Sequence, residues 1–178
     1  MPKAPYPEIS AYALMKEENA MTSLLPFNAS QVAQYYLAKC SEVGELISPL
    51  KMQKLVYYAY AWSLVKNDVR LFGEPIEAWP NGPVVPSLYR NLKGYGSTAI
   101  GEDFIDNEGV SQFLAQSSPE VLGTVDKVLQ AYVPKSAFEL VALTHSEKPW
   151  KQAREGLTPT EASSKPLSDA DIIAQFSK

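Results

Sequence analysis

The segment "SPLKMQKLVYYAYAWSLVK", residues 48–66, restricts the possible folds of this chain most, because it predicts a helix that is apolar on nearly every side. Ser48 is a typical N-cap, and Pro49 stands in the first turn, where a missing N–H does no harm. The apolar residues form two adjacent stripes at helical spacing, namely Met52, Leu55, Val56, Ala59, Trp62 and Val65, and Tyr57, Tyr60, Ala61 and Leu64. Such a helix lies inside a bundle rather than on its surface. The alternative, that the tyrosines are stacking platforms for nucleic-acid bases, is the weaker interpretation.

The charge of the chain argues against nucleic acid as its main partner. The 178 residues carry a formal net charge of -4 and have an isoelectric point near 5.1, whereas binding by phosphate neutralisation needs a basic face. Two basic pairs, Lys51 with Lys54 and Arg90 with Lys93, stand three residues apart, and we expect them to be solvated helix faces. Apolar residues make up 46% and charged residues 20%, which is typical of one soluble globular domain.

Capping and stop signals predict further helices on both sides of this segment. Asn28 and Gln31 form a capping-box pattern at the start of a helix that ends at Gly44. Further helices are expected to begin at Pro86, Ser118, Ser136, Pro149 and Ser168. The predicted fold class is therefore mainly α, a single-domain compact helical bundle with a short β-hairpin or extended elbow around residues 73–85.

Two stretches lack a helical pattern. Residues 1–22 contain several prolines and are expected to be a mobile N-terminal extension of a domain that spans residues 23–178. Residues 94–117 are rich in glycine and acidic residues, and we expect the part around "DFIDNEG" to be a solvated loop, because it lacks the regular alternation of a calcium-binding loop.

The segment "EAWPNGPVVPSLYRNLKGYG", residues 77–96, combines prolines and glycines with aromatic and basic side chains. Pro80, Asn81 and Gly82 predict a turn, and the flanking prolines Pro80 and Pro83 restrict any strand pairing to a short edge ladder. Pro86 then begins a helix. The segment is thus predicted to be a rigid support for its aromatic and basic side chains.

The residues offer no catalytic, metal or cofactor site. Cys40 is the single cysteine and lies on the apolar stripe of the first predicted helix, which favours a core role and gives no sign of an oxidising compartment. His145 is the single histidine, and we expect a structural role for it at the end of a helix. There is no phosphate-binding glycine motif, no secretion signal and no apolar run long enough to span a membrane. The expected location is the cytoplasm.

Several blocks of the chain resemble the Panacea domain, a family that contains phage-associated GepA proteins and SocA-like antitoxins. They are "LKMQKLVYYAYAW", "EPIEAWPNGPVVPSLYRNLKGYG", "ELVALTHSEKPWKQAR" and "LSDADIIAQF", and they occur in the family's order over roughly residues 28–177. The combination of "EAWPNGPVVPSLY" with "LTHSEKPW" is far more specific than a single short motif.

The resemblance implies an antitoxin that neutralises the toxin encoded by a neighbouring gene through direct protein contact, without catalysis or a cofactor. In the SocA-like branch it implies a proteolytic adaptor that delivers a SocB-like toxin to the protease ClpXP. A sequestering antitoxin without degradation stays open, as does a DNA-binding autorepressor. A hydrolase or transferase is a further alternative and would have to use His145 or the acidic residues.

Tryptophan, tyrosine and arginine are common anchors of protein interfaces, and this points to one set of residues in the 77–96 segment. Candidate toxin-binding residues are Trp79, Tyr89, Arg90 and Tyr95, with Lys93 at the rim. The structural part of the motif is expected to be Pro80, Gly82, Pro83, Pro86, His145 and Trp150. An alternative for the two tryptophans is that Trp79 and Trp150 pack together to hold the segment.

Overall fold

The computed structural model describes residues 27–178, and the expected extension 1–22 lies outside them. The helices are α2 (Ala29–Glu42), α3 (Pro49–Asn67), α4 (Pro86–Leu92), α5 (Asn107–Gln116), α6 (Pro119–Tyr132), α7 (Ala137–Ser146), α8 (Lys148–Ala153) and α9 (Asp169–Phe176), with short 3-10 turns η1 (Lys93–Tyr95) and η2 (Glu102–Phe104). Strands β1 (Glu77–Trp79) and β2 (Gly82–Val84) complete the fold. The predicted mainly α fold with a small hairpin is confirmed.

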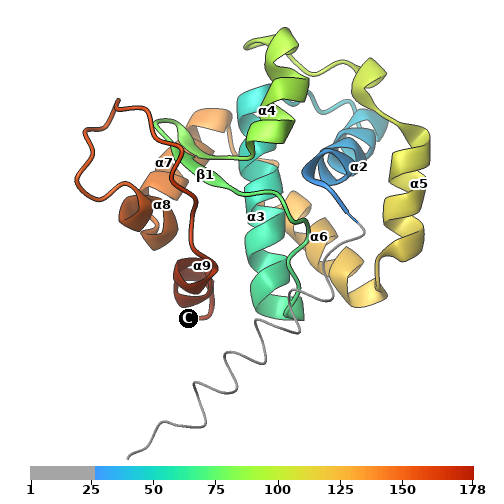
Figure 1. Ribbon diagram of the computed structural model, residues 1–178. Helices are drawn as coiled ribbons and strands as arrows, with labels where there is room; N and C mark the ends of the chain where they lie inside the picture. The colour runs from blue at the N-terminus through green and yellow to red at the C-terminus, as the bar shows by residue number, and fades with distance from the viewer. Residues whose placement is uncertain (1–26) are drawn as a thin grey trace, which may run out of the picture.

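Helix α3 lies at the centre of the molecule, as its all-round apolar sequence predicts. It packs against α6, α9 and α7 and also touches α2 and α4 (Figure 1). Every residue from Lys51 to Ala61 is buried. Its tyrosines belong to the core, since Tyr57 and Tyr58 are almost fully buried. This burial excludes their use as exposed stacking platforms.

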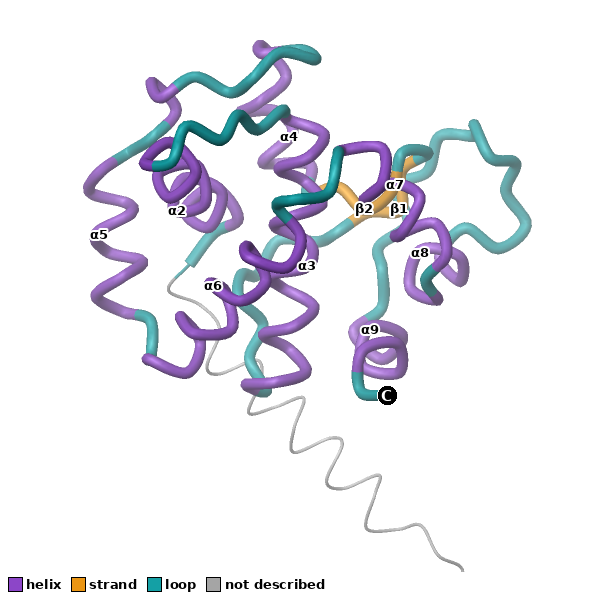
Figure 2. Tube along the Cα trace, turned by 180° about the vertical axis from the view of Figure 1, so that it is seen from behind, coloured by secondary structure: helices purple, strands orange, loops and turns teal. Residues whose placement is uncertain are grey.

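The other helices cover α3 from two sides. Helices α2, α4, α5 and α6 lie on one side, and α7, α8 and α9 lie on the other (Figures 1 and 2). The predicted capping boxes form at Asn28 and Ser136, and Cys40 is buried, so that burial raises the pKa of its thiol. None of the helices in the described part of the chain is both long and apolar enough to cross a membrane.

The predicted hairpin forms from two short antiparallel strands, with Glu77 opposite Val84 and Trp79 opposite Gly82. The segment before α9 runs beside it, because the Ala78 N–H donates to the Lys165 carbonyl at 2.9 Å and the Leu167 N–H donates to the Ile76 carbonyl at 2.7 Å. These bonds tie the end of the chain to the hairpin. The sequence predicts only a linker there.

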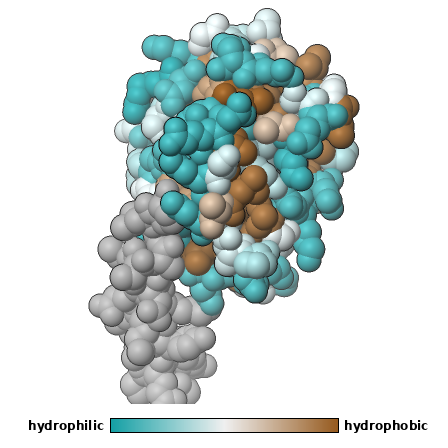
Figure 3. All heavy atoms as spheres, turned by 90° about the vertical axis from the view of Figure 1, so that its right-hand side faces the viewer, coloured by the Kyte–Doolittle hydropathy of each residue, from teal (hydrophilic) through white to brown (hydrophobic). Residues whose placement is uncertain are grey.

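The prediction of a solvated loop around residues 101–117 is wrong for its second half, which is helix α5. Asp106 caps this helix by accepting a hydrogen bond from the Glu108 N–H. Phe113 is fully buried, with its ring centroid 4.9 Å from that of Phe27 and 5.1 Å from that of Tyr35. Figure 3 looks onto this side of the molecule, where hydrophobic surface lies between hydrophilic side chains. Tertiary packing therefore outweighs the weak helical preference of this segment.

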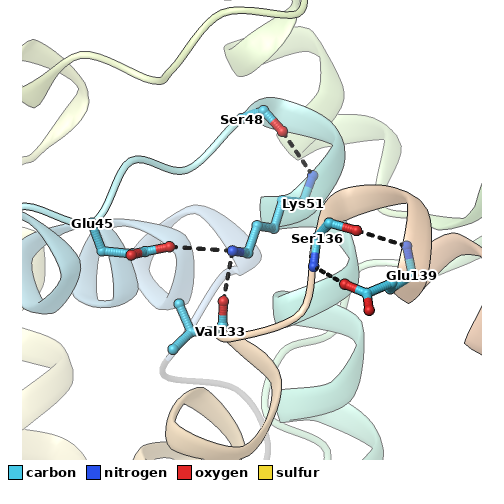
Figure 4. A network of polar contacts seen from close by, with 6 residues as sticks. All are labelled: Glu45, Ser48, Lys51, Val133, Ser136 and Glu139. Carbon is cyan, nitrogen blue, oxygen red and sulfur yellow. Dashed lines mark hydrogen bonds and ion pairs between the residues drawn. The ribbon is translucent and has the colours of Figure 1, made fainter.

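The prediction that Lys51 and Lys54 form a solvated face is also wrong. Lys51 is 8% exposed, and its ammonium group donates to the Val133 carbonyl at 2.6 Å and lies 3.4 Å from a carboxylate oxygen of Glu45 (Figure 4). It thus joins the loop before α3 to the turn before α7. The apolar stem of a lysine packs in the interior when its charged end finds an acceptor.

Candidate functional site

The backbone of the 77–96 segment is held by buried polar side chains from α3. Gln53 makes a pair of hydrogen bonds with Val85, accepting from its N–H at 2.9 Å and donating to its carbonyl at 3.2 Å. Gln53 is buried, so both bonds form away from water. This pairing satisfies the backbone of the residue that leads into α4.

Lys54 is fully buried and donates to the Pro83 carbonyl at 3.0 Å. Desolvation by burial lowers the pKa of its ammonium group to about 7. The side chain lies directly against Gly82, where an added Cβ would stand 2.7 Å from the Lys54 Cε and 2.8 Å from the Thr144 Oγ1. Gly82 also has φ of +102°, a conformation that L side chains rarely adopt. The turn therefore needs glycine for two independent reasons.

Residues of α7 and α8 hold the hairpin from its other side. The Trp150 Nε1–H donates to the Trp79 carbonyl at 2.8 Å, so the two tryptophans are linked through the Trp79 backbone. His145 stacks on the Trp150 ring with centroids 3.9 Å apart and planes 14° apart. His145 lies at the end of α7 as predicted, and it also hydrogen-bonds the Pro80 carbonyl. Burial lowers the pKa of its imidazole. These contacts show His145 supporting the turn between the strands.

Arg154, just beyond α8, completes this support. Its guanidinium group lies 5.3 Å from the centroid of the Trp150 ring and donates to the Ala78 carbonyl at 2.8 Å. It also donates to the carbonyls of Thr158 and Glu161, at 2.8 Å and 2.7 Å. Arg154 is buried, and its fork of donors joins β1 to the loop that leads to α9.

The outer side of the segment carries most of the candidate binding residues. The rings of Trp79 and Tyr89 meet edge to face at 4.9 Å, and the Trp79 Nε1–H donates to Glu77 at 2.7 Å. Tyr89 is 43% exposed, and Arg90 and Lys93 are exposed on the same short helix or directly after it. These four candidates form an aromatic pair with two neighbouring cations.

Tyr95 differs from the other candidates because its hydroxyl group already has a partner. It is half-buried and donates to Asp103 at 2.9 Å, in the loop before α5. The structural candidates Pro80, Pro83 and Pro86 lie in the turn, in β2 and at the first position of α4. Pro83 is buried, and Pro80 and Pro86 are half-buried.

Sequence reasoning missed the buried polar residues that carry the segment. They are Gln53, Lys54, Thr144, Glu147 and Arg154. Glu147 accepts a hydrogen bond from the Tyr58 hydroxyl at 3.0 Å, and burial raises the pKa of its carboxyl group to about 7. The available signal was the position of Gln53 and Lys54 in a helix that is apolar all round, because a polar group there must find a partner on another element.

The described part of the chain contains no group of three or more histidine, cysteine or acidic side chains that could hold a metal ion. What the site does offer is a rigid backbone with an exposed aromatic and basic face. Such a face is suited to recognising another macromolecule.

Comparison with known proteins agrees with this geometry. Residues 52–151 match the family model described as "Antitoxin SocA-like, Panacea domain". The chain belongs to this family. A Panacea-domain relative, the protein named "Antitoxin SocA" from Caulobacter vibrioides (strain NA1000 / CB15N), is 33% identical over 128 residues, which cover 69% of this chain and 68% of the relative. No solved structure matches the chain. The matched Panacea range contains Gln53, Lys54, the whole hairpin and the His145–Trp150 pair, so it includes most of the support described above.

Replacing Trp150 with phenylalanine tests this support. The change keeps an aromatic ring and removes the N–H that binds the Trp79 carbonyl, and we expect the unfolding free energy to fall by about 1 kcal/mol in urea denaturation. Hydrogen exchange of the hairpin amides should quicken. The matched control is Trp62→Phe, because the Trp62 Nε1–H also makes a hydrogen bond, to the Tyr132 hydroxyl at 3.0 Å and away from the hairpin. Equal exchange rates at the hairpin in both variants would contradict the assigned role of Trp150.

Proposed function

We propose that the protein is an antitoxin that neutralises a toxin encoded by a neighbouring gene, by direct protein contact in the cytoplasm. The observation that carries this proposal is the exposed aromatic and basic face of the 77–96 segment on a backbone fixed from two sides. The relative named "Antitoxin SocA" supports the same function. The protein acts in this proposal by binding and not as an enzyme, and His145 supports the turn rather than a reaction.

The toxin-binding residues in this proposal are Trp79, Tyr89 and Arg90, with Lys93 at the rim. An interface anchor binds tightly when its geometry is fixed before the partner arrives, because little conformational entropy is then lost. The contact between the Trp79 and Tyr89 rings restricts both side chains in this way. Tyr95 belongs to the proposed face as well, and its bond to Asp103 holds its ring in place.

The double substitution Tyr89→Ala with Arg90→Ala tests the face directly. We expect it to weaken toxin binding at least about tenfold, since interface aromatic and arginine residues each typically contribute more than 1 kcal/mol. The change in unfolding free energy should be small, because both side chains are exposed. Isothermal titration calorimetry with the purified toxin measures the effect.

A matched control for this experiment is Phe138→Ala with Lys135→Ala. These residues are also an exposed aromatic and an exposed cation, at the start of α7. The control variant should bind the toxin as the parent protein does. Unchanged toxin affinity in a folded Tyr89 and Arg90 variant would remove this face from the interface.

We further propose that the mechanism is that of a SocA-like adaptor, which delivers a SocB-like toxin to the protease ClpXP. The experiment follows the half-life of the neighbouring gene product in cells with and without this protein, and with and without ClpX. Rescue of growth with a shortened toxin half-life that depends on ClpX supports the adaptor. Rescue with a stable toxin would show sequestration instead, and a harmless neighbour would contradict the antitoxin function itself.

A further inference from the structure

An open groove of about 460 Å³ lies between the C-terminal half of α3 and helix α6. Its apolar lining includes Trp62 and Tyr132, together with Val128. The two helices that frame it are seen together in Figure 2. None of the lining residues belongs to the 77–96 segment, so the groove is a separate feature of the surface.

The aromatic floor of the groove is rigid. The Trp62 Nε1–H donates to the Tyr132 hydroxyl at 3.0 Å, and the Tyr132 ring stacks on that of Tyr58 with centroids 4.0 Å apart and planes 9° apart. Tyr58 in turn donates to the buried Glu147. The floor is therefore fixed by contacts that continue into the core of the molecule, and an apolar group entering the groove meets a surface that is already ordered.

The groove also contains an unsatisfied acceptor. The Asn67 side-chain oxygen is buried and has no hydrogen-bond partner among the described residues. A buried polar atom without a partner costs about 1–3 kcal/mol. A donor brought by a bound molecule, such as the backbone N–H of a peptide, would remove this cost.

The charge around the groove is positive, although the chain as a whole is acidic. Lys66 and Lys127 are exposed and belong to its lining, and that lining includes no aspartate or glutamate. The Lys66 ammonium group lies 5.6 Å from the centroid of the Trp62 ring, so its charge stands over the aromatic floor. An apolar floor with lysines beside it complements an apolar side chain flanked by carboxylates.

We propose that this groove is a docking site for an acidic peptide segment that places one or two apolar side chains on Trp62 and Tyr132. The peptide backbone donates to Asn67, and the flanking carboxylates pair with Lys66 and Lys127. This inference does not depend on which face binds the toxin. It gives the protein a second interaction surface.

The test uses three fluorescein-labelled peptides, Glu-Asp-X-X-Glu-Asp-Glu with X as leucine, phenylalanine or tryptophan, and the full chain. Fluorescence anisotropy is expected to show binding that weakens as salt is added, because the carboxylates pair with exposed lysines. The double reversal Lys66→Glu with Lys127→Glu should weaken binding at least tenfold. Ala131→Phe, an exposed position in the groove, should do the same by filling it.

The matched control is Lys135→Glu with Lys165→Glu, which reverses two exposed lysines outside the groove. It should bind the peptides as the parent does, and circular dichroism should show that all variants are folded. The proposal is overturned if none of the three peptides binds, if peptides with lysine in place of the acidic residues bind equally well, or if Ala131→Phe retains full affinity. These outcomes leave the proposed antitoxin function untouched, because toxin binding is measured separately.

Discussion

Gly82→Ala is expected to lower the unfolding free energy by about 2–5 kcal/mol. A non-glycine residue at positive φ costs about 1–2 kcal/mol, and overpacking of a filled interior costs about 1–3 kcal/mol more. Both apply here, because Gly82 has φ of +102° and its added Cβ would stand 2.7 Å from the Lys54 Cε. Lys54 is fully buried and bonded to the Pro83 carbonyl, so its side chain cannot move aside without losing that bond. Urea or thermal denaturation measures the loss.

Gly44→Ala provides the matched control for this substitution. Gly44 has φ of +72°, and an added Cβ there would meet no atom within 4 Å. It therefore isolates the backbone cost, and we expect a loss of only about 1–2 kcal/mol. Equal losses in the two variants would show that the contact with Lys54 and Thr144 is unimportant. Gly82→Ala should also reduce toxin neutralisation, since the turn positions Trp79.

The second large effect is a dependence of stability on pH that comes from Lys54. Its pKa falls from 10.5 to about 7 in the folded protein because of desolvation. Between these values the unfolded chain binds more protons than the folded one, so the unfolding free energy rises with pH. Integrated from about pH 7 to 9.5, the contribution is about 3 kcal/mol. Below about pH 7 both states bind the proton, and the contribution disappears.

Lys54→Met is the substitution that isolates this effect, because it keeps a long apolar side chain and removes the titrating group. The difference in unfolding free energy between parent and variant should change by about 3 kcal/mol over this pH range. Glu147 contributes in the opposite direction at lower pH. Its folded pKa is raised to about 7 from 4.5, so its contribution to stability is lost as pH rises through this interval. A pH difference that survives in Lys54→Met would assign the effect to other groups.

The position of α3 could be predicted because its sequence allows little else. A helix with apolar residues on every side needs cover on every side, and only a bundle provides it. The helix starts were equally local, since Asn28 and Ser136 form their capping boxes with residues three positions later. The hairpin was placed correctly because Pro80 and Gly82 restrict the backbone themselves.

The errors arose where distant segments decide the outcome. Phe113 turns residues 107–116 into a helix by packing against Tyr35 and Phe27, which no local pattern shows. Lys54 looked like a surface residue, because a lysine three positions after another is usually solvated. Its acceptor is the carbonyl of Pro83, 29 positions away in sequence.

The candidate site divides in the same way between sequence and tertiary structure. The sequence by itself determined the central helix, the turn and the aromatic and basic composition of the 77–96 segment, because these depend on backbone restriction and helical periodicity. Only the tertiary structure decided that Gln53, Lys54, Trp150 and Arg154 hold the backbone of this segment, and that Tyr95 turns to Asp103. Buried polar groups need partners, and the fold alone brings those partners within hydrogen-bonding distance.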